Sequence, residues 1–200
     1  MSEHPIAIVI PTLDEAKGQA TGRLALLSAG CDAELIVSAG PRRGFTLTVN
    51  DGIRRTGGNE DVMILNDDVV WFQYGWLAIL QRAIYRQDDY GIAGPSGKSN
   101  TAPLANGFIG QHGIEPVHHL PFWCALVKRV VFDKIGLLDE EFIHYGSDNW
   151  FCEVARRAGY QSIWVRDVYL EHTSHGSGLI TEWRVRDQDL LAQRMGRHRR

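Results

Sequence analysis

Two carboxylates and an amide follow directly on a short apolar run of the sequence. The run ends at Leu65, and Asn66, Asp67 and Asp68 come next. Adjacent acidic groups repel each other unless a cation or several hydrogen-bond donors lie between them. The motif could therefore hold a divalent cation. It could equally place Asp68 as the cap of a following helix with Asp67 in solvent, and the motif alone leaves both interpretations open.

A third carboxylate lies at the expected start of a later helix. Asp148 follows Ser147, which we expect to cap a helix that buries Phe151 and ends at Gly159. A positioned carboxylate can act as a general base toward a hydroxyl, which is a poor nucleophile at neutral pH. A carboxylate in the first turn also stabilises a helix through the helix dipole. The two roles do not exclude each other.

The elements that must position these side chains are apolar runs separated by stretches with helical periodicity. Residues 6–10 form a continuous apolar run that ends at Pro11, which is typical of a buried parallel strand. Similar runs occur at 35–37, 62–65 and 163–165. We expect helices at 76–84, 130–135, 147–159 and 181–191. This alternation predicts an α/β fold with a mostly parallel central sheet and helices on both faces, and ligands of such sheets bind beyond the carboxyl ends of the strands.

The stretch from Gly94 to Leu120 is rich in Gly, Pro, Asn and His and has no clear period. Loops of that length in compact domains are usually functional or disordered. We therefore predict a mobile flap over residues 96–119 that orders when a ligand binds.

The composition limits the classes of protein that this chain can belong to. It has 200 residues, of which 44% are hydrophobic and 22% are charged, and its net charge is -3. This predicts a single domain over residues 1–200. The net charge gives no reason to expect a nucleic-acid partner, although arginines make the end of the chain basic.

Cysteine usage and hydropathy indicate a cytoplasmic protein. Cys31, Cys124 and Cys152 are odd in number and widely spaced, which favours reduced thiols. The first residues lack the pattern of a signal peptide, and we expect no transmembrane segment because no apolar run approaches about 20 residues.

Several motifs, taken in order along the chain, resemble those of the family 2 glycosyltransferases, which have the GT-A fold. In the first half of the chain, the shared segments are a first strand with its nucleotide loop at 8–15, an Asn-x-Gly helix start at 50–52, and a metal-binding motif with Asn in first place at 66–68. In the second half they are a Phe that follows a Gly-ended helix, at 136–142, an acidic helix start at 146–152, and an Ala-Gly-Tyr helix end at 158–160. The resemblance covers about residues 6–177.

The resemblance implies a GT-A-like fold with a donor half up to about residue 95, an acceptor half over about 96–180, and a C-terminal helix with a basic tail over about 181–200. It also implies transfer of a sugar from a nucleoside-diphosphate sugar to an acceptor hydroxyl, with inversion. Asp148 matches the residue that acts as the base in the inverting members. Asp68 matches the metal ligand, and His172 matches a histidine that contacts the metal or the diphosphate, with His175 as the alternative.

The same resemblance assigns the donor-binding residues. Asn66 and Asp67 would lie near the ribose and diphosphate, and Thr12 and Glu15 would flank the nucleotide. Two further positions belong to this group: Ser38 stands where many members have an Asp that reads the base, and Arg43, with Arg42, could reach the diphosphate or lie on the surface.

A divalent cation suits this chemistry because it stabilises the charge that develops on a diphosphate leaving group. Either Mn²⁺ or Mg²⁺ fits, and a histidine ligand favours Mn²⁺. Two other functions stay open, a sugar-nucleotide-forming nucleotidyltransferase and a non-catalytic module that binds nucleotide sugars. The acidic segment from Pro11 to Glu15 disfavours the first, because that reaction needs a Gly-rich basic loop there. The acceptor is not identified, and a nucleic-acid acceptor has no support in the sequence.

Overall fold

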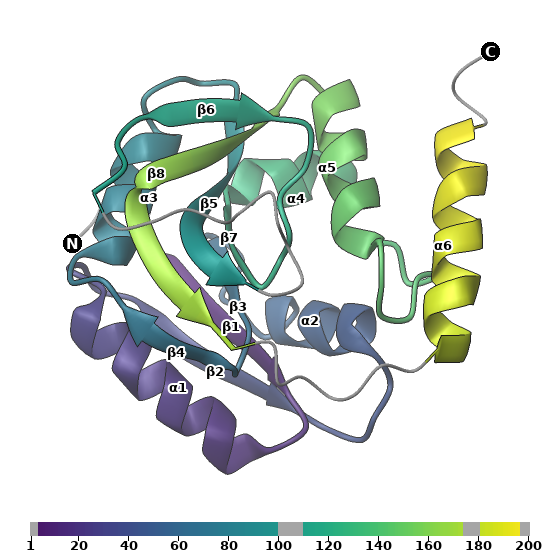
Figure 1. Cartoon of the computed structure of the whole chain (residues 1–200), viewed down its shortest axis with the longest axis horizontal. Coiled ribbons are helices and arrows are strands. Elements are labelled where there is room, and N and C mark those ends of the chain that lie inside the picture. Colours follow the sequence, from purple (N-terminus) through teal and green to yellow (C-terminus); the bar gives the residue numbers. More distant parts are fainter. Residues whose placement is uncertain (1–3, 100–109, 174–180, 197–200) are drawn as a thin grey trace.

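The computed structural model describes residues 4–99, 110–173 and 181–196. Within these residues, one sheet of eight strands has the order β2-β1-β3-β7-β5-β8-β4, and β6 pairs with β8 (Figure 1). The strands are β1 (Ile6–Thr12), β2 (Glu34–Ala39), β3 (Asp61–Leu65), β4 (Val69–Phe72), β5 (Tyr90–Ser99), β6 (Ile114–Val117), β7 (Cys124–Val127) and β8 (Gln161–His172). The helices are α1 (Glu15–Ser28), α2 (Phe45–Ile53), α3 (Trp76–Ile84), α4 (Arg129–Ile135), α5 (Ser147–Arg157) and α6 (Thr181–Gly196).

Five strands of this sheet run in the same direction. Strand β1 is parallel to β2 and β3, and β5 is parallel to β8. Strand β7 lies between β3 and β5 and is antiparallel to both, so β3 and β5 point the same way. Strands β4 and β6 are antiparallel to β8. The predicted mostly parallel α/β fold is confirmed, and the carboxyl ends of β1, β2, β3, β5 and β8 meet at one edge.

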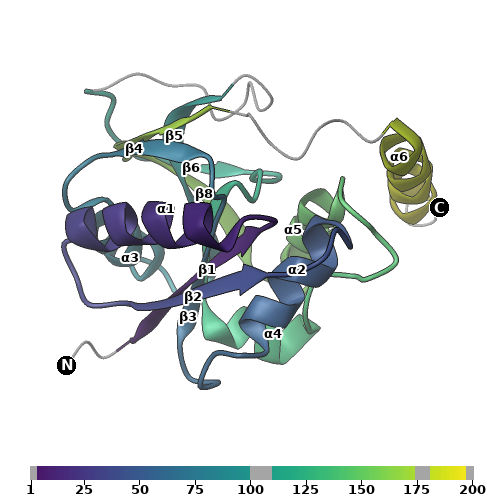
Figure 2. The same cartoon turned by 90° about the horizontal axis from the view of Figure 1, so that it is seen from below.

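Helices cover both faces of the sheet, as Figure 2 shows. Alternate residues of β1 point to opposite faces, which is the geometry of an extended strand. Ile8 packs in the core on the side of α1 and α3, whereas Val9 packs in the core on the side of α2, α4 and α5. Both side chains are fully buried, which explains why the sequence reads here as a continuous apolar run.

Helix α1 lies close against the sheet because it presents glycines to it. A Cβ atom on Gly18 would be 2.8 Å from Val37 Cγ1, and one on Gly22 would be 2.5 Å from Leu35 Cδ2. The N-cap of this helix is Asp14, whose carboxylate accepts a hydrogen bond from the Lys17 amide at 3.1 Å. The approach of α1 brings its first turn next to the carboxyl end of β1.

The structure corrects the predicted flap. Residues 90–99 belong to β5 and residues 114–117 to β6, so both ends of the stretch are part of the sheet. Irregular composition hid these strands, because β5 contains three glycines and a proline and shifts register along β8. Residues 100–109 lie outside the described part, and the ordering of a lid stays a prediction.

Three local predictions at helix starts also change. Asp68 does not cap a helix, because β4 follows it and α3 begins after Gly75. Ser147 is the first residue of α5, whose N-cap is Gly146 in the left-handed region at φ 76°. Asn50 lies in the last turns of α2 and not at a helix start. No helix in the described ranges is long and apolar enough to cross a membrane.

Candidate active site

A buried Asp–His pair lies at the edge where the parallel strands end. Asp68 follows β3, and His172 is the last residue of β8. Asp68 Oδ1 and His172 Nε2 are 2.8 Å apart, and both side chains are buried. Burial raises the pKa of Asp68, but the contact with His172 and the charge of Lys17 outweigh it and leave that pKa below its usual value. Asp68 is therefore an ionised carboxylate.

Neighbouring backbone and ring contacts fix both members of the pair. The Asp68 carbonyl accepts hydrogen bonds from the Thr173 amide and hydroxyl, each at 3.0 Å, which joins the two strand ends. The indole ring of Trp123 stacks on the His172 imidazole, with 5.1 Å between centroids and 7° between planes. Asn66 Nδ2 lies 3.4 Å from His172 Nε2. Three residues thus hold the imidazole in one orientation.

The donor atoms of this pair fit a divalent cation. Two ligands in adjacent coordination positions, with bonds of about 2.1 Å, have donor atoms about 3 Å apart, and the Asp68–His172 separation is close to that. In the described ranges no group of three His, Cys, Asp or Glu side chains is placed to hold a metal. The protein would supply these two ligands and leave the other positions to phosphate oxygens and water, which suits Mg²⁺ or Mn²⁺.

Asp67 turns away from this pair toward the first strand and helix. Its carboxylate accepts hydrogen bonds from Thr12 Oγ1 at 2.5 Å and from Lys17 Nζ at 3.0 Å. Its carbonyl accepts one from Thr21 Oγ1 at 2.8 Å. The charge of Asp67 is thus partly balanced by Lys17. The structure brings together Thr12 with Asp67, and Asn66 and Asp68 with His172, and their roles toward a donor or a metal stay predictions.

Three other predicted donor-binding residues are placed differently. Glu15 is an exposed residue of the first turn of α1. Ser38 is buried, and its hydroxyl donates a hydrogen bond to the Thr48 carbonyl at 2.7 Å, which ties β2 to α2. Arg43 forms an ion pair with Asp51 of α2. The hydroxyl and the guanidinium have partners within the fold, and the roles of all three toward a donor stay predictions.

Asp148 lies in the first turn of α5, with both carboxylate oxygens held by backbone amides. Oδ2 accepts a hydrogen bond from Phe122 N at 3.3 Å, and Oδ1 accepts one from Asn149 N at 2.8 Å. Burial raises the pKa of Asp148 above its usual value, although the two N–H groups oppose the shift. A carboxylate with a raised pKa is a stronger base, which suits proton abstraction.

The segment before β7 connects the Asp–His pair to Asp148, and the sequence patterns did not reveal it. Phe122 N donates to Asp148, and the next residue, Trp123, stacks on His172. The Trp123 carbonyl also accepts the Asn66 amide at 2.8 Å. This dipeptide therefore contacts both Asp148, through the Phe122 amide, and the pair, through the Trp123 ring. An apolar segment in front of a short strand carries no motif that marks such a role.

Comparison of the sequence with those of known proteins finds a related hexosyltransferase. No protein-family model matches the chain. The chain is 25% identical over 142 residues to the low-salt glycan biosynthesis hexosyltransferase Agl10 of Haloferax volcanii, a match that covers 60% of this chain and 46% of that protein. The chain thus spans about half the length of this curated relative.

Solved glycosyltransferase structures superpose on most of the chain. GalNAc-T7 with UDP, GalNAc and Mn²⁺ matches at a TM-score of 0.67 and 10% identity, covering 88% of this chain and 45% of that one. Glucosyl-3-phosphoglycerate synthase from Mycobacterium tuberculosis, with Mn²⁺, UDP-glucose and phosphoglyceric acid, matches at 0.66 and 11%, covering 98% and 81%. The mannosyltransferase PcManGT from Pyrobaculum calidifontis, with GDP-Man and Mn²⁺, matches at 0.64 and 15%, covering 98% and 64%. The chain therefore has the GT-A fold that the resemblance implied.

Proposed function

We propose that this chain is a metal-dependent glycosyltransferase that moves a hexose from a nucleoside-diphosphate sugar to an acceptor hydroxyl with inversion. The observation that carries the proposal is the buried Asp68–His172 pair at the carboxyl edge of the sheet, together with Asp148, which the dipeptide Phe122–Trp123 links to that pair. Related proteins add support, since Agl10 is named a hexosyltransferase and the superposed structures hold UDP or GDP sugars with Mn²⁺.

The donor would bind along the carboxyl edge of β1 and β3. Asp68 and His172 would hold Mn²⁺ or Mg²⁺, which neutralises charge on the diphosphate. Asn66 and Asp67 would contact the ribose and diphosphate, and Thr12 positions Asp67 through its hydrogen bond. Lys17 pairs with Asp67 and limits the negative charge that a diphosphate would meet.

Asp148 would take the proton from the acceptor hydroxyl as its oxygen attacks the anomeric carbon. The new C–O bond forms while the bond from the anomeric carbon to the diphosphate oxygen breaks, and the nucleoside diphosphate leaves with the electron pair. One displacement of this kind inverts the anomeric centre. The held carboxylate needs no reorganisation before it accepts the proton, because two backbone N–H groups already orient it.

The two alternative functions that the sequence left open are less well supported than glycosyl transfer. A nucleotidyltransferase needs a basic Gly-rich loop after the first strand, whereas Thr12 here binds the Asp14 carbonyl and Asp67. A non-catalytic module would have no use for a half-buried carboxylate that two backbone amides hold in place with a raised pKa. We also propose a cytosolic location, which is compatible with three free cysteines. The acceptor stays unassigned.

Thermal-shift measurements against UDP, GDP, TDP and CDP, each with Mn²⁺ or with a chelator, test the proposal. A ligand that binds only the folded state raises the melting temperature with its occupancy. We expect at least one nucleotide to raise it with Mn²⁺, and the matching sugar nucleotide to be hydrolysed or transferred. No shift with any nucleotide would contradict the function.

A further inference from the structure

Helix α6 is attached to the fold through a buried carboxylate, beside partly exposed apolar contacts such as that of Trp183 with His144. Asp187 is fully buried, whereas the other residues of α6 are partly or wholly exposed. Figure 1 shows the helix standing at the outer edge of the molecule beside α5. A buried carboxylate is costly unless hydrogen bonds compensate for its lost hydration. The partners of Asp187 therefore identify what the helix holds.

Three consecutive backbone amides surround this carboxylate. Ile143 N donates to Oδ1 at 3.1 Å, and His144 N and Tyr145 N donate to Oδ2 at 2.7 Å and 2.9 Å. Arg186 Nη1 lies 2.9 Å from Oδ1. Residues 143–145 have no regular secondary structure, so Asp187 satisfies amides that a strand or helix would otherwise satisfy.

The same loop contacts the start of α2. Thr46 N donates to the Ile143 carbonyl at 3.2 Å, and Phe45 N donates to His144 Nδ1 at 3.2 Å. Burial lowers the pKa of His144, which keeps the ring neutral and its nitrogen able to accept. Gly44 makes room for this contact, since a Cβ atom there would be 2.1 Å from the Ile143 carbonyl oxygen. The loop is thus held between α2 and α6.

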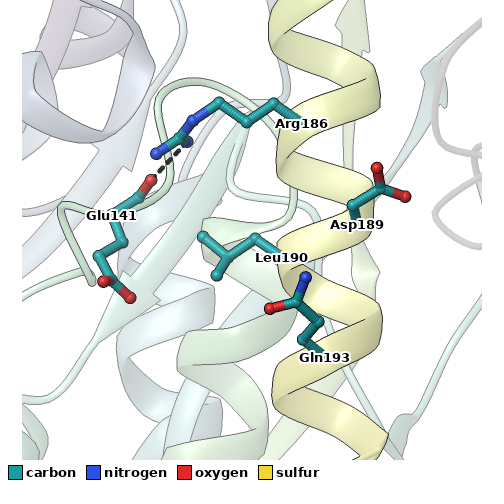
Figure 3. Close-up of a pocket in the computed structure, with 5 residues that line it drawn as sticks. All are labelled: Glu141, Arg186, Asp189, Leu190 and Gln193. Atoms are coloured by element: carbon teal, nitrogen blue, oxygen red, sulfur yellow. Dashed lines mark hydrogen bonds between the residues drawn. The ribbon is translucent and has the colours of Figure 1, made fainter.

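Charged contacts along α6 reinforce this attachment. Arg186 Nη1 donates a hydrogen bond to the Glu141 carbonyl at 2.7 Å (Figure 3), and Arg194 pairs with Asp139 and with the Glu141 carboxylate. A shallow pocket of about 300 Å³ lies between the helix and Glu141, and Asp189 is on its wall. The pocket shares no residue with the carboxylate clamp that Asp187 forms on residues 143–145.

We propose that Asp187 is a positioning residue, which sets the place of Asp148 by clamping residues 143–145 directly before α5. Gly146 separates the clamped loop from the helix and has φ 76°, so the chain turns sharply between them. A shift of the loop moves the first turn of α5 and breaks the hydrogen bond from Phe122 N to Asp148. The catalytic part of this inference rests on the proposed function, and the structural part does not.

The test compares Asp187→Asn with Asp189→Asn by amide hydrogen exchange, read residue by residue in the full chain. The Asn side chain keeps the size but sets an NH₂ donor against backbone donors. Exchange at residues 143–145 and at the Phe122 amide should become about tenfold faster in Asp187→Asn, because a charge-assisted bond is lost. Asp189 is exposed on the same helix, so Asp189→Asn removes the same charge and should leave these amides unchanged.

Turnover and donor affinity complete the test. In Asp187→Asn the kcat for transfer should fall about tenfold, while the Kd of the donor stays within about twofold, because Asp68 and His172 are untouched. Faster exchange at 143–145 with an unchanged Phe122 amide would overturn the proposal. So would fast exchange of the His144 amide in the wild type, a result that needs no variant to fold. If the chain transfers no sugar, exchange at Phe122 still decides the role of Asp187.

Discussion

Replacement of Asp148 by Asn separates a catalytic role from a structural one, because the two roles predict opposite changes. Asn keeps the size and one carbonyl oxygen, and it can still accept the Phe122 amide. It cannot take a proton. The expected loss of turnover is the roughly 10²–10⁴-fold of a missing general base, equivalent to about 2.7–5.5 kcal/mol in the activation free energy.

The effect of Asp148→Asn on stability follows from the raised pKa of Asp148. A carboxyl group whose pKa is higher in the folded than in the unfolded protein binds more protons when folded, so stability falls as the pH rises through these pKa values. At neutral pH the ionised side chain therefore costs folding free energy. Asn removes that cost, but its NH₂ group then faces one of the two backbone N–H donors, so the melting temperature at pH 7 should change little.

Three measurements on purified Asp148→Asn decide between the roles: turnover, donor affinity with Mn²⁺, and melting temperature. The catalytic role predicts a large loss of turnover with the other two nearly unchanged. A helix-dipole role predicts a loss of about 0.3–1 kcal/mol of stability with transfer intact. Turnover near that of the wild type would show that Asp148 is not the general base.

Three further predictions test the surroundings of the site. Gly52→Ala should destabilise the fold by about 1–3 kcal/mol in chemical denaturation, since a Cβ atom would be 2.3 Å from Val9 Cγ1. Gly196→Ala should show no such loss, because the space around Gly196 is open. Trp123→Leu should weaken the Mn²⁺ dependence of nucleotide binding about tenfold or more, because the His172 imidazole loses its stacking partner. Trp123→Phe keeps an aromatic ring there and should weaken it much less. Equal results for the two variants in calorimetry would contradict this prediction. Cys152 should resist maleimide labelling of the native protein at pH 7, because burial raises its pKa to about 12, and fast labelling would show that its site opens.

The sequence predicted the parts of the fold that carry strong local patterns. Residues 6–10 and 62–65 are buried on both faces of the sheet, so their apolar runs were unambiguous, and 76–84 has helical spacing over one buried face. Strand β5 was missed because its Gly and Pro residues resemble a loop, and its stability comes from long-range pairing with β8. Strand β7 was missed although its four residues are as buried as 62–65, because its place between β3 and β5 depends on long-range antiparallel pairing.

In the candidate site, too, the sequence indicated some of the residues that the structure brings together and missed others. Asp68 and His172 were chosen from motifs about a hundred residues apart, and the structure brings them within contact. Ser38 lies near the end of β2 and Arg43 follows that strand, which ends at the correct edge, yet their polar groups bind Thr48 and Asp51. Side-chain direction within a loop depends on neighbours that no local pattern specifies. Trp123 was missed for that reason.

The most direct test of the metal-dependent function is a titration of the preferred nucleoside diphosphate against wild type and Asp68→Ala, with Mn²⁺ and with excess chelator. The account predicts that Mn²⁺ strengthens binding to the wild type at least tenfold, and that Asp68→Ala, although folded, binds equally weakly in both conditions. Equal affinity of the wild type with Mn²⁺ and with chelator would contradict the account.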